Sequence, residues 1–307
     1  MSLKNNIIKF MTKKIIGKKN DEQMIELIKS GGEKTEYNSE GFRIVKKDIP
    51  SKYEFSQKKY SNLIIEEMFL KDKVDKKDKK AVLFFHGGGY LAKLTDIYTP
   101  FMMRFCDAYE EATIISIEYT TIQDAPFPAA YNDAITAWNY VTSLGYKPEN
   151  IIIAGDSAGG GLGLALTLYL RDNDIAIKAY IGMSPWVTLN CTSECFTNLE
   201  KKKTDPLFGS SNVIENVAKM YIDKGDVNDW RISPLNGLFD NMPKMFITYG
   251  TEEILRDDIQ ELYDRASLKT DVVLKVYDKC QHDIQTSSAP EAAKAWNDIK
   301  EYIRTLN

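Results

Sequence analysis

Short apolar runs alternate with longer stretches of helical periodicity from residue 81 to the end of the chain. The runs are rich in β-branched residues and short, which is typical of buried strands. They are "AVLFF" (81–85), "ATIISIEY" (112–119), "NIIIAG" (150–155), "IKAYIGMSP" (177–185), "KMFITYG" (244–250) and "VVLKVYD" (272–278). Because parallel strands are joined by crossover helices, this alternation predicts an α/β fold built on a parallel sheet.

Two parts of the chain depart from the alternation. Extended segments are expected before it, around residues 41–49 and 61–70. Residues 187 to about 228 then interrupt it between two strands. We interpret this interruption as a partly helical insertion, which above an α/β sheet often forms a lid.

The bulk composition is that of an ordinary globular protein, with 43% hydrophobic and 27% charged residues. A net charge of −4 gives no electrostatic reason to expect a nucleic-acid partner. Four cysteines are too sparse for a disulfide framework, and two histidines leave few ligands for a zinc site. We therefore expect reduced thiols, no metal ion and a cytoplasmic location.

The N-terminal stretch "MSLKNNIIKFMTKKIIGKK" is interrupted by lysines, so it lacks the continuous apolar region of a signal peptide or a spanning helix. Ile7, Phe10, Met11 and Ile15 fall on one face of a helix. This face either packs on the protein itself or touches a membrane surface. Packing is the more common outcome, and we predict it here.

A glycine-rich turn lies in the stretch "IIIAGDSAGGGLGLAL" (151–166), between an expected strand and an expected helix. Such turns hold either phosphates or nucleophiles. No Gly-Lys-Ser or Gly-Lys-Thr occurs in the chain, and the dinucleotide fingerprint fails at Leu166. The signature G-x-S-x-G fits residues 155–159 completely and centres on Ser157. We therefore predict that Ser157 is a nucleophile.

His86 and the three glycines after it, Gly87, Gly88 and Gly89, follow the strand-like run "AVLFF". Glycines at such a position free backbone N–H groups to face a developing oxyanion. We expect the amides of Gly87 and Gly88 to form an oxyanion hole with the amide of Ala158. His86 and Gly89 are expected to support this loop.

A nucleophilic serine also needs a general base. The chain has only two histidines, and His86 belongs to the glycine-rich loop. His282 lies downstream of Ser157, which is the chain order of an α/β-hydrolase triad. Elimination therefore predicts His282 as the base.

These motifs resemble the hormone-sensitive-lipase-like branch of the α/β-hydrolases, which includes bacterial carboxylesterases and arylacetamide deacetylases. The matching pieces lie within residues 81–307 and are "HGGGY", "PFPAAYND", "GDSAGG", "SPW", "RISPL", "YGTEEILRDD" and the loop around His282. The resemblance implies one α/β-hydrolase domain over residues 1–307, with a mostly parallel sheet flanked by helices. It also implies a helical cap, formed by about 1–40 and about 187–228.

The third member of the triad is also expected from this resemblance. Such enzymes are similar in using an aspartate within a pattern like D-x-L-x-D, which aligns with Glu253, Leu255 and Asp257. Glu253 is the predicted acid, although glutamate is one methylene longer than aspartate. Asp257 and Glu252 remain open as alternatives.

The predicted function is that of a serine carboxylesterase, which cleaves short- to medium-chain acyl or aryl esters through an acyl-enzyme. No cofactor or metal is implied, and the expected partner is a small-molecule ester, with a homodimer left open. Two alternatives remain: an amide, formamide or carbamate hydrolase with the same triad, and a non-catalytic binding protein on this scaffold. Candidates for pocket or cap residues, each also explicable as plain packing, are Phe10, Met11, Trp186, Phe208 and Met220.

Overall fold

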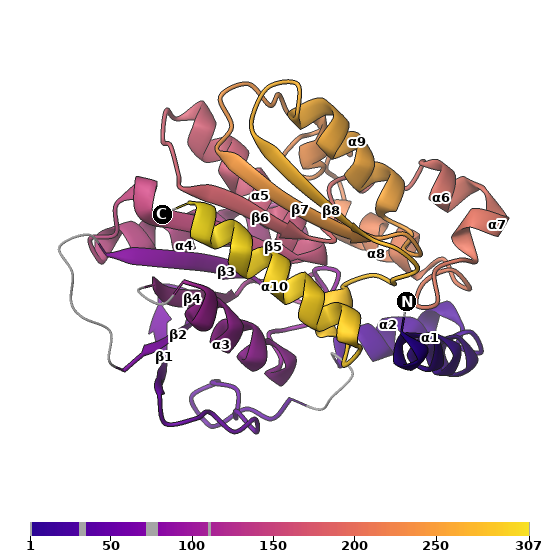
Figure 1. Ribbon diagram of the computed structural model, residues 1–307, viewed down its shortest axis with the longest axis horizontal. Coiled ribbons are helices and arrows are strands. Elements are labelled where there is room, and N and C mark those ends of the chain that lie inside the picture. The colour runs from indigo at the N-terminus through magenta and orange to yellow at the C-terminus, as the bar shows by residue number, and fades with distance from the viewer. Residues whose placement is uncertain (1, 31–34, 72–78, 110–111, 307) are drawn as a thin grey trace.

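A twisted eight-stranded sheet runs through the described part of the chain, which in this computed structural model comprises residues 2–30, 35–71, 79–109 and 112–306 (Figure 1). The strands are β1 (Tyr53–Tyr60), β2 (Leu63–Leu70), β3 (Lys80–Phe85), β4 (Ala112–Glu118), β5 (Ile151–Asp156), β6 (Ala179–Met183), β7 (Lys244–Gly250) and β8 (Val272–Tyr277). Their order is β1-β2-β4-β3-β5-β6-β7-β8.

The sheet is mostly parallel, as the sequence predicts. β1 pairs antiparallel with β2, and β2 pairs antiparallel with β4, whereas all pairs from β4 to β8 are parallel. The central strands β3 and β5 are buried along almost their whole length. Because parallel strands end at the same edge of a sheet, the loops after β3, β5, β7 and β8 meet there.

Helices cover both faces of the sheet. They are α1 (Leu3–Ile16), α2 (Asp21–Lys29), α3 (Thr99–Ala108), α4 (Ala129–Ser143), α5 (Ser157–Asp172), α6 (Glu194–Thr197), α7 (Leu199–Lys202), α8 (Val213–Ile222), α9 (Arg256–Ala266) and α10 (Pro290–Thr305). One core cluster joins α3 and α10 to the sheet, and a larger cluster joins it to α4, α5, α8 and α9. The outcome is a three-layer α/β structure.

The segment that interrupts the strand alternation is helical, as expected, and contains α6, α7 and α8. It meets the N-terminal helices at one end of the sheet (Figure 1). Asp21, at the start of α2, accepts hydrogen bonds from the backbone of Asn212 at 3.0 Å and the side chain of Asn216 at 2.9 Å. The two segments therefore pack against each other.

Two sequence predictions differ from the structure near the N-terminus. The stretch 41–49 forms no strand and contributes only an isolated bridge between Tyr37 and Arg43. The strand β1, with the polar sequence "YEFSQKKY", was not foreseen, because an edge strand has few buried positions to reveal it.

The predicted orientation of the first helix is wrong. Helix α1 forms and lies on the protein, but Ile7, Phe10, Met11 and Ile15 point outward and are exposed. Its buried residue is Asn5. The 3.6-residue period correctly predicted one apolar face, yet the contacts with the protein are made by the opposite side, through polar groups such as Asn5 and Lys9 together with Ile16.

Candidate active site

Ser157 lies at the sharp turn between β5 and α5, with φ of 50°. This left-handed backbone is uncommon for a residue other than glycine and is the strained turn that a nucleophile elbow requires. A Cβ atom at Gly159 would overlap the carbonyl oxygens of Phe85 and His86, and one at Gly155 would overlap Gly159. The two flanking glycines therefore allow the turn to sit directly on β3.

His282 reaches Ser157 from the loop between β8 and α10. Its Nε2 atom lies 2.9 Å from Ser157 Oγ, and both residues are buried. At this distance a neutral imidazole accepts the hydroxyl proton, which is the geometry needed by a general base. The structure thus brings together two predicted site residues that are 125 positions apart.

Of the three carboxylates considered after β7, only Glu253 lies beside His282. Its Oε2 atom is 3.8 Å from His282 Nδ1, and it accepts hydrogen bonds from Ser184 Oγ at 2.7 Å and from the Gly250 amide at 3.1 Å. A separation of 3.8 Å is too long for a hydrogen bond but close enough for an ion pair with the imidazolium. The hydrogen bond from Ser184 Oγ holds the Glu253 carboxylate in this position.

The two alternative acids are engaged elsewhere. Asp257 accepts a hydrogen bond from the Cys195 amide at 2.9 Å, and Glu252 pairs with Lys9 of α1. Neither contacts His282 among the described interactions. The structure therefore removes the geometric basis for Asp257 or Glu252 as the acid.

A further carboxylate, which the sequence analysis missed, lies at the other ring nitrogen. Asp283 Oδ2 is 3.2 Å from His282 Nε2, the same atom that faces Ser157. Asp283 has a left-handed backbone, with φ of 50° and ψ of 52°, and its amide donates to Ser184 Oγ at 3.2 Å. The sequence "QHD" shows that Asp283 directly follows the candidate base His282. It does not show the left-handed backbone of Asp283.

The charges around His282 change its acidity. Burial lowers its pKa, but the carboxylates of Asp283 and Glu253 outweigh burial and hold the pKa well above its usual range. Burial raises the pKa of Glu253, and the charge of His282 and the hydrogen bond from Ser184 only partly oppose this. The site therefore stabilises the imidazolium that forms when the serine loses its proton.

The expected oxyanion hole needs one correction. The Gly87 amide donates to Asp156 Oδ1 at 2.9 Å, and Asp156 is held in turn by Tyr98 Oη at 2.9 Å. Gly87 is therefore not free to bind an oxyanion, and the sequence could not show this because Asp156 lies 69 residues away. Among the described hydrogen bonds, the amides of Gly88, Gly89 and Ala158 have no acceptor.

His86 organises the glycine-rich loop rather than the chemistry. Its Nδ1 donates to the Gly87 carbonyl at 2.7 Å, and its ring stacks on Tyr119 with centroids 4.3 Å apart. Burial lowers the pKa of His86 to about 4, so the ring is neutral at physiological pH. A neutral histidine with this tautomer holds the loop without adding charge beside the site.

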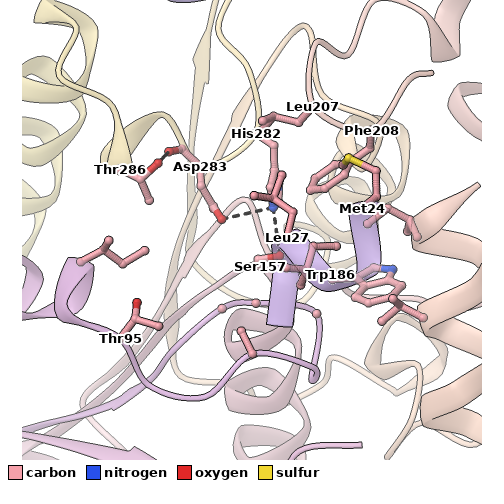
Figure 2. Close-up of a pocket in the computed structure, with 18 of the residues that line it drawn as sticks. Met24, Leu27, Thr95, Ser157, Trp186, Leu207, Phe208, His282, Asp283 and Thr286 are labelled. Atoms are coloured by element: carbon pink, nitrogen blue, oxygen red, sulfur yellow. Dashed lines mark hydrogen bonds and ion pairs between the residues drawn. The ribbon is translucent and has the colours of Figure 1, made fainter. Parts of the chain in front are cut away.

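Ser157 and His282 open onto a cavity of about 280 Å³ (Figure 2). One wall is apolar, and its residues come from α2, α8 and the loops after β6 and α7; they are Met24, Leu27, Ile28, Trp186, Leu207, Phe208, Ile214 and Val217. On the other side of the Ser157–His282 pair, Figure 2 shows Thr95, Asp283 and Thr286. The hydroxyl of Thr95 and Oδ1 of Asp283 are buried without a hydrogen-bond partner in the described structure.

The chain matches the family model described as alpha/beta hydrolase fold over residues 82–286. It belongs to that family. This α/β-hydrolase is 30% identical to an acetyl-hydrolase of Streptomyces hygroscopicus over 195 residues, which are 63% of this chain and 64% of the relative. The match thus spans slightly less than two thirds of the relative's length. The chain is also 28% identical to an esterase of Acinetobacter venetianus over 230 residues, or 74% of this chain and 75% of that one.

A solved esterase of the bacterial hormone-sensitive lipase family is similar over its length. The TM-score is 0.82 at 23% identity, covering 100% of this chain and 99% of the other. This likeness shows the fold. The predicted fold class and the predicted membership of the α/β-hydrolases are confirmed.

Several other features of this α/β-hydrolase bear on the site. Of the predicted pocket or cap residues, Trp186 and Phe208 line the cavity, whereas Phe10, Met11 and Met220 are exposed. The four cysteines are free thiols. No group of three or more metal-ligating side chains is found within the described ranges, and each helix there is too short or too polar to cross a bilayer.

Proposed function

We propose that this protein is a serine carboxylesterase with Ser157 as nucleophile, His282 as general base and Glu253 as the acid. The observation that carries the proposal is the 2.9 Å approach of Ser157 Oγ and His282 Nε2 on a strained strand-to-helix turn. Relatives named esterase and acetyl-hydrolase support an ester as the substrate.

In this mechanism His282 Nε2 takes the proton as Ser157 Oγ attacks the ester carbonyl. The free amides of Gly88, Gly89 and Ala158 stabilise the tetrahedral oxyanion, with the positive end of α5 behind Ala158. His282 then protonates the leaving alcohol, and in the second half it activates water to release the acid from Ser157. Glu253 stabilises the imidazolium, and the 3.8 Å gap to Nδ1 shortens as charge develops.

Short- to medium-chain acyl or aryl esters fit the cavity best. A volume of about 280 Å³ lies at the small end for ligand pockets, and its main wall is apolar. Helices α2 and α8 supply much of this wall, through Met24, Leu27, Ile214 and Val217. We propose that the N-terminal helices and the 187–228 insertion together act as a cap that limits substrate length.

A fluorophosphonate probe tests whether the site is catalytic. We expect the wild type to be labelled and Ser157→Ala not to be, with Ser267→Ala, an exposed serine at the end of α9, as the matched control. No labelling of the wild type would favour a non-catalytic binding protein.

Matched p-nitrophenyl esters and p-nitroanilides then test the substrate class. We expect kcat/KM to be highest for short or medium acyl esters and far lower for the anilides. A chain-length series that peaks at long acyl chains, or anilides cleaved faster than esters, would contradict the proposal.

A further inference from the structure

The outward side of α1 is apolar and exposed. Leu3 is 76% and Phe10 67% exposed, and Ile7, Met11 and Ile15 are about half exposed. These residues follow the i, i+3, i+4 spacing of one helix face, so together they form a continuous outward stripe. Soluble proteins rarely expose such a stripe without a use for it, because grouped apolar side chains favour contact with another apolar phase. We call these five residues the α1 stripe.

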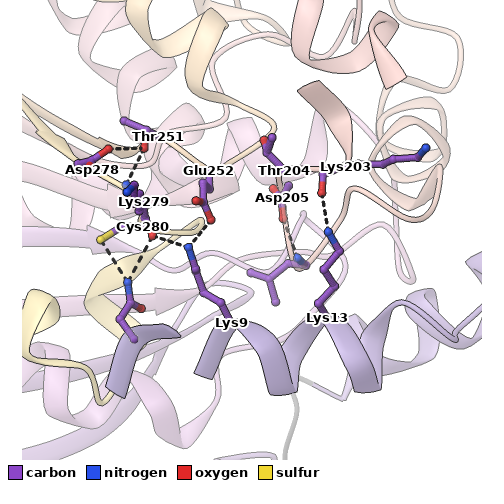
Figure 3. Close-up of polar contacts among 12 residues, drawn as sticks. Lys9, Lys13, Lys203, Thr204, Asp205, Thr251, Glu252, Asp278, Lys279 and Cys280 are labelled. Atoms are coloured by element: carbon purple, nitrogen blue, oxygen red, sulfur yellow. Dashed lines mark hydrogen bonds and ion pairs between the residues drawn. The ribbon is translucent and has the colours of Figure 1, made fainter. Parts of the chain in front are cut away.

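The orientation of α1 is set by polar contacts on its opposite side (Figure 3). Lys9 Nζ donates to the Lys279 carbonyl at 2.9 Å and pairs with Glu252, while Asn5 Nδ2 donates to the same carbonyl at 3.4 Å. Lys13 Nζ donates to the Lys203 carbonyl at 3.1 Å, near the end of α7. Several independent contacts thus keep this side inward and the α1 stripe outward.

Positive charge accompanies the stripe. The first 20 residues contain six lysines and no acidic residue, although the whole chain has a net charge of −4. Lys4, Lys14 and Lys18 are exposed, and none of the described carboxylates pairs with them. Lys14 lies three and four positions after Met11 and Phe10, and is therefore their neighbour on the helix surface. Basic side chains beside an exposed apolar face are the pattern of helices that lie in a membrane interface.

We propose that the α1 stripe and its lysines dock this protein onto an anionic lipid surface. The apolar side chains enter the headgroup boundary, and the lysines bind the acidic headgroups. A second copy of the chain fits less well, because a two-fold contact through this face would bring the two sets of lysines together. The charge of the helix is complementary to acidic lipid and repels another α1.

Docking would also orient the cavity. Ile16 at the end of α1 and Met24, Leu27 and Ile28 of α2 line the cavity beside Ser157. The helix that we propose to meet lipid therefore also contributes Ile16 to one wall of the cavity. Lipid binding itself does not depend on the proposed catalysis, so the two can be tested separately.

Vesicle flotation tests this proposal with the full chain. The vesicles are phosphatidylcholine alone or phosphatidylcholine mixed with anionic phosphatidylglycerol, each at low and high salt. We expect the wild type to float with the anionic vesicles at low salt and to be released by salt or by omission of phosphatidylglycerol. Because each lysine near an acidic surface contributes about 1 kcal/mol, the double variant Lys14→Gln, Lys18→Gln should partition roughly thirtyfold less.

The apolar part is tested by the double variant Ile7→Ser, Phe10→Ser, which should lose binding. The matched control is Leu268→Ser, an exposed leucine after α9, which should bind as the wild type does. Turnover of a small soluble ester should be unchanged in all variants, because none of these residues lines the cavity.

Three outcomes would overturn the proposal. The first is that the wild type does not bind anionic vesicles. The second is that Leu268→Ser loses binding as fully as the stripe variant. The third is that light scattering finds a wild-type dimer which Ile7→Ser, Phe10→Ser converts to a monomer, because the stripe would then be covered by a second copy.

Discussion

Asp283 Oδ2 lies 3.2 Å from His282 Nε2, the ring nitrogen that also faces Ser157 Oγ at 2.9 Å. The base therefore has a carboxylate near each of its nitrogens, with Glu253 on the Nδ1 side. Both carboxylates favour the protonated ring, and together they hold the pKa of His282 well above its usual range against the effect of burial. A base with a raised pKa is a stronger proton acceptor but is neutral only at higher pH.

The first prediction follows from Asp283. An asparagine at this position would keep the shape of the side chain and tolerate the left-handed backbone, while the negative charge would be lost. In Asp283→Asn the pKa of His282 falls, so the neutral, active ring persists to lower pH. The acid limb of the kcat/KM profile, measured with p-nitrophenyl butyrate, should therefore move to lower pH.

Asp278→Asn is the control and should leave the acid limb in place. An acid limb that stays or moves to higher pH in Asp283→Asn would contradict the conclusion that Asp283 raises the pKa of His282.

The second prediction separates the three candidate acids. Glu253→Gln should lower kcat by roughly 10³- to 10⁴-fold, because an amide cannot stabilise the imidazolium. Asp257→Asn and Glu252→Gln should each keep kcat within about threefold of the wild type, because their contacts are with Cys195 and Lys9. Steady-state kinetics with one ester decide the question. If Asp257→Asn proved the more damaging change, Glu253 would not be the acid.

Much of the fold could be predicted because short buried strands and amphipathic helices leave strong local signals. The predicted strand at residues 81–85 and the turn around Ser157 are present, and the family resemblance correctly placed them in an α/β-hydrolase. Elimination between the two histidines, together with the chain order of Ser157 and His282, predicted that these two residues would meet.

What could not be predicted depends on contacts between distant residues. The Gly87 amide is bound by Asp156, and no local pattern in the glycine-rich loop reveals that partner. Asp283 faces the base only because of its left-handed backbone. Helix α1 shows the limit most clearly, since its period marks an apolar face but not which side contacts the protein.

The third prediction concerns the glycines of α5. A Cβ atom at Gly159 would overlap backbone oxygens of Phe85 and His86, and backbone cannot move aside without disturbing β3. Gly159→Ala should therefore reduce stability by more than about 4 kcal/mol or prevent soluble expression.

At Gly163 the nearest atoms are side-chain carbons of Ile153 at 3.1 Å and Phe85 at 3.5 Å, which can move aside. Gly163→Ala should be much milder in urea unfolding, because alanine gains about 1 kcal/mol of helix propensity; equal losses in both variants would contradict this distinction.

The fourth prediction concerns a buried ionic cluster between the N-terminal segment and the sheet. Arg43 is almost fully buried, forms two hydrogen bonds with Glu66 at 2.6 Å, and reaches Asp96 at 2.8 Å. Arg43→Met removes the cation but leaves both carboxylates buried, so it should cost about 3–5 kcal/mol of unfolding free energy. Lys269→Gln breaks a pair with Asp240 in which both side chains are about half exposed, and it should cost less than about 1 kcal/mol. Urea unfolding compares the two, and similar losses would mean that burial does not set the energetics of the Arg43 cluster.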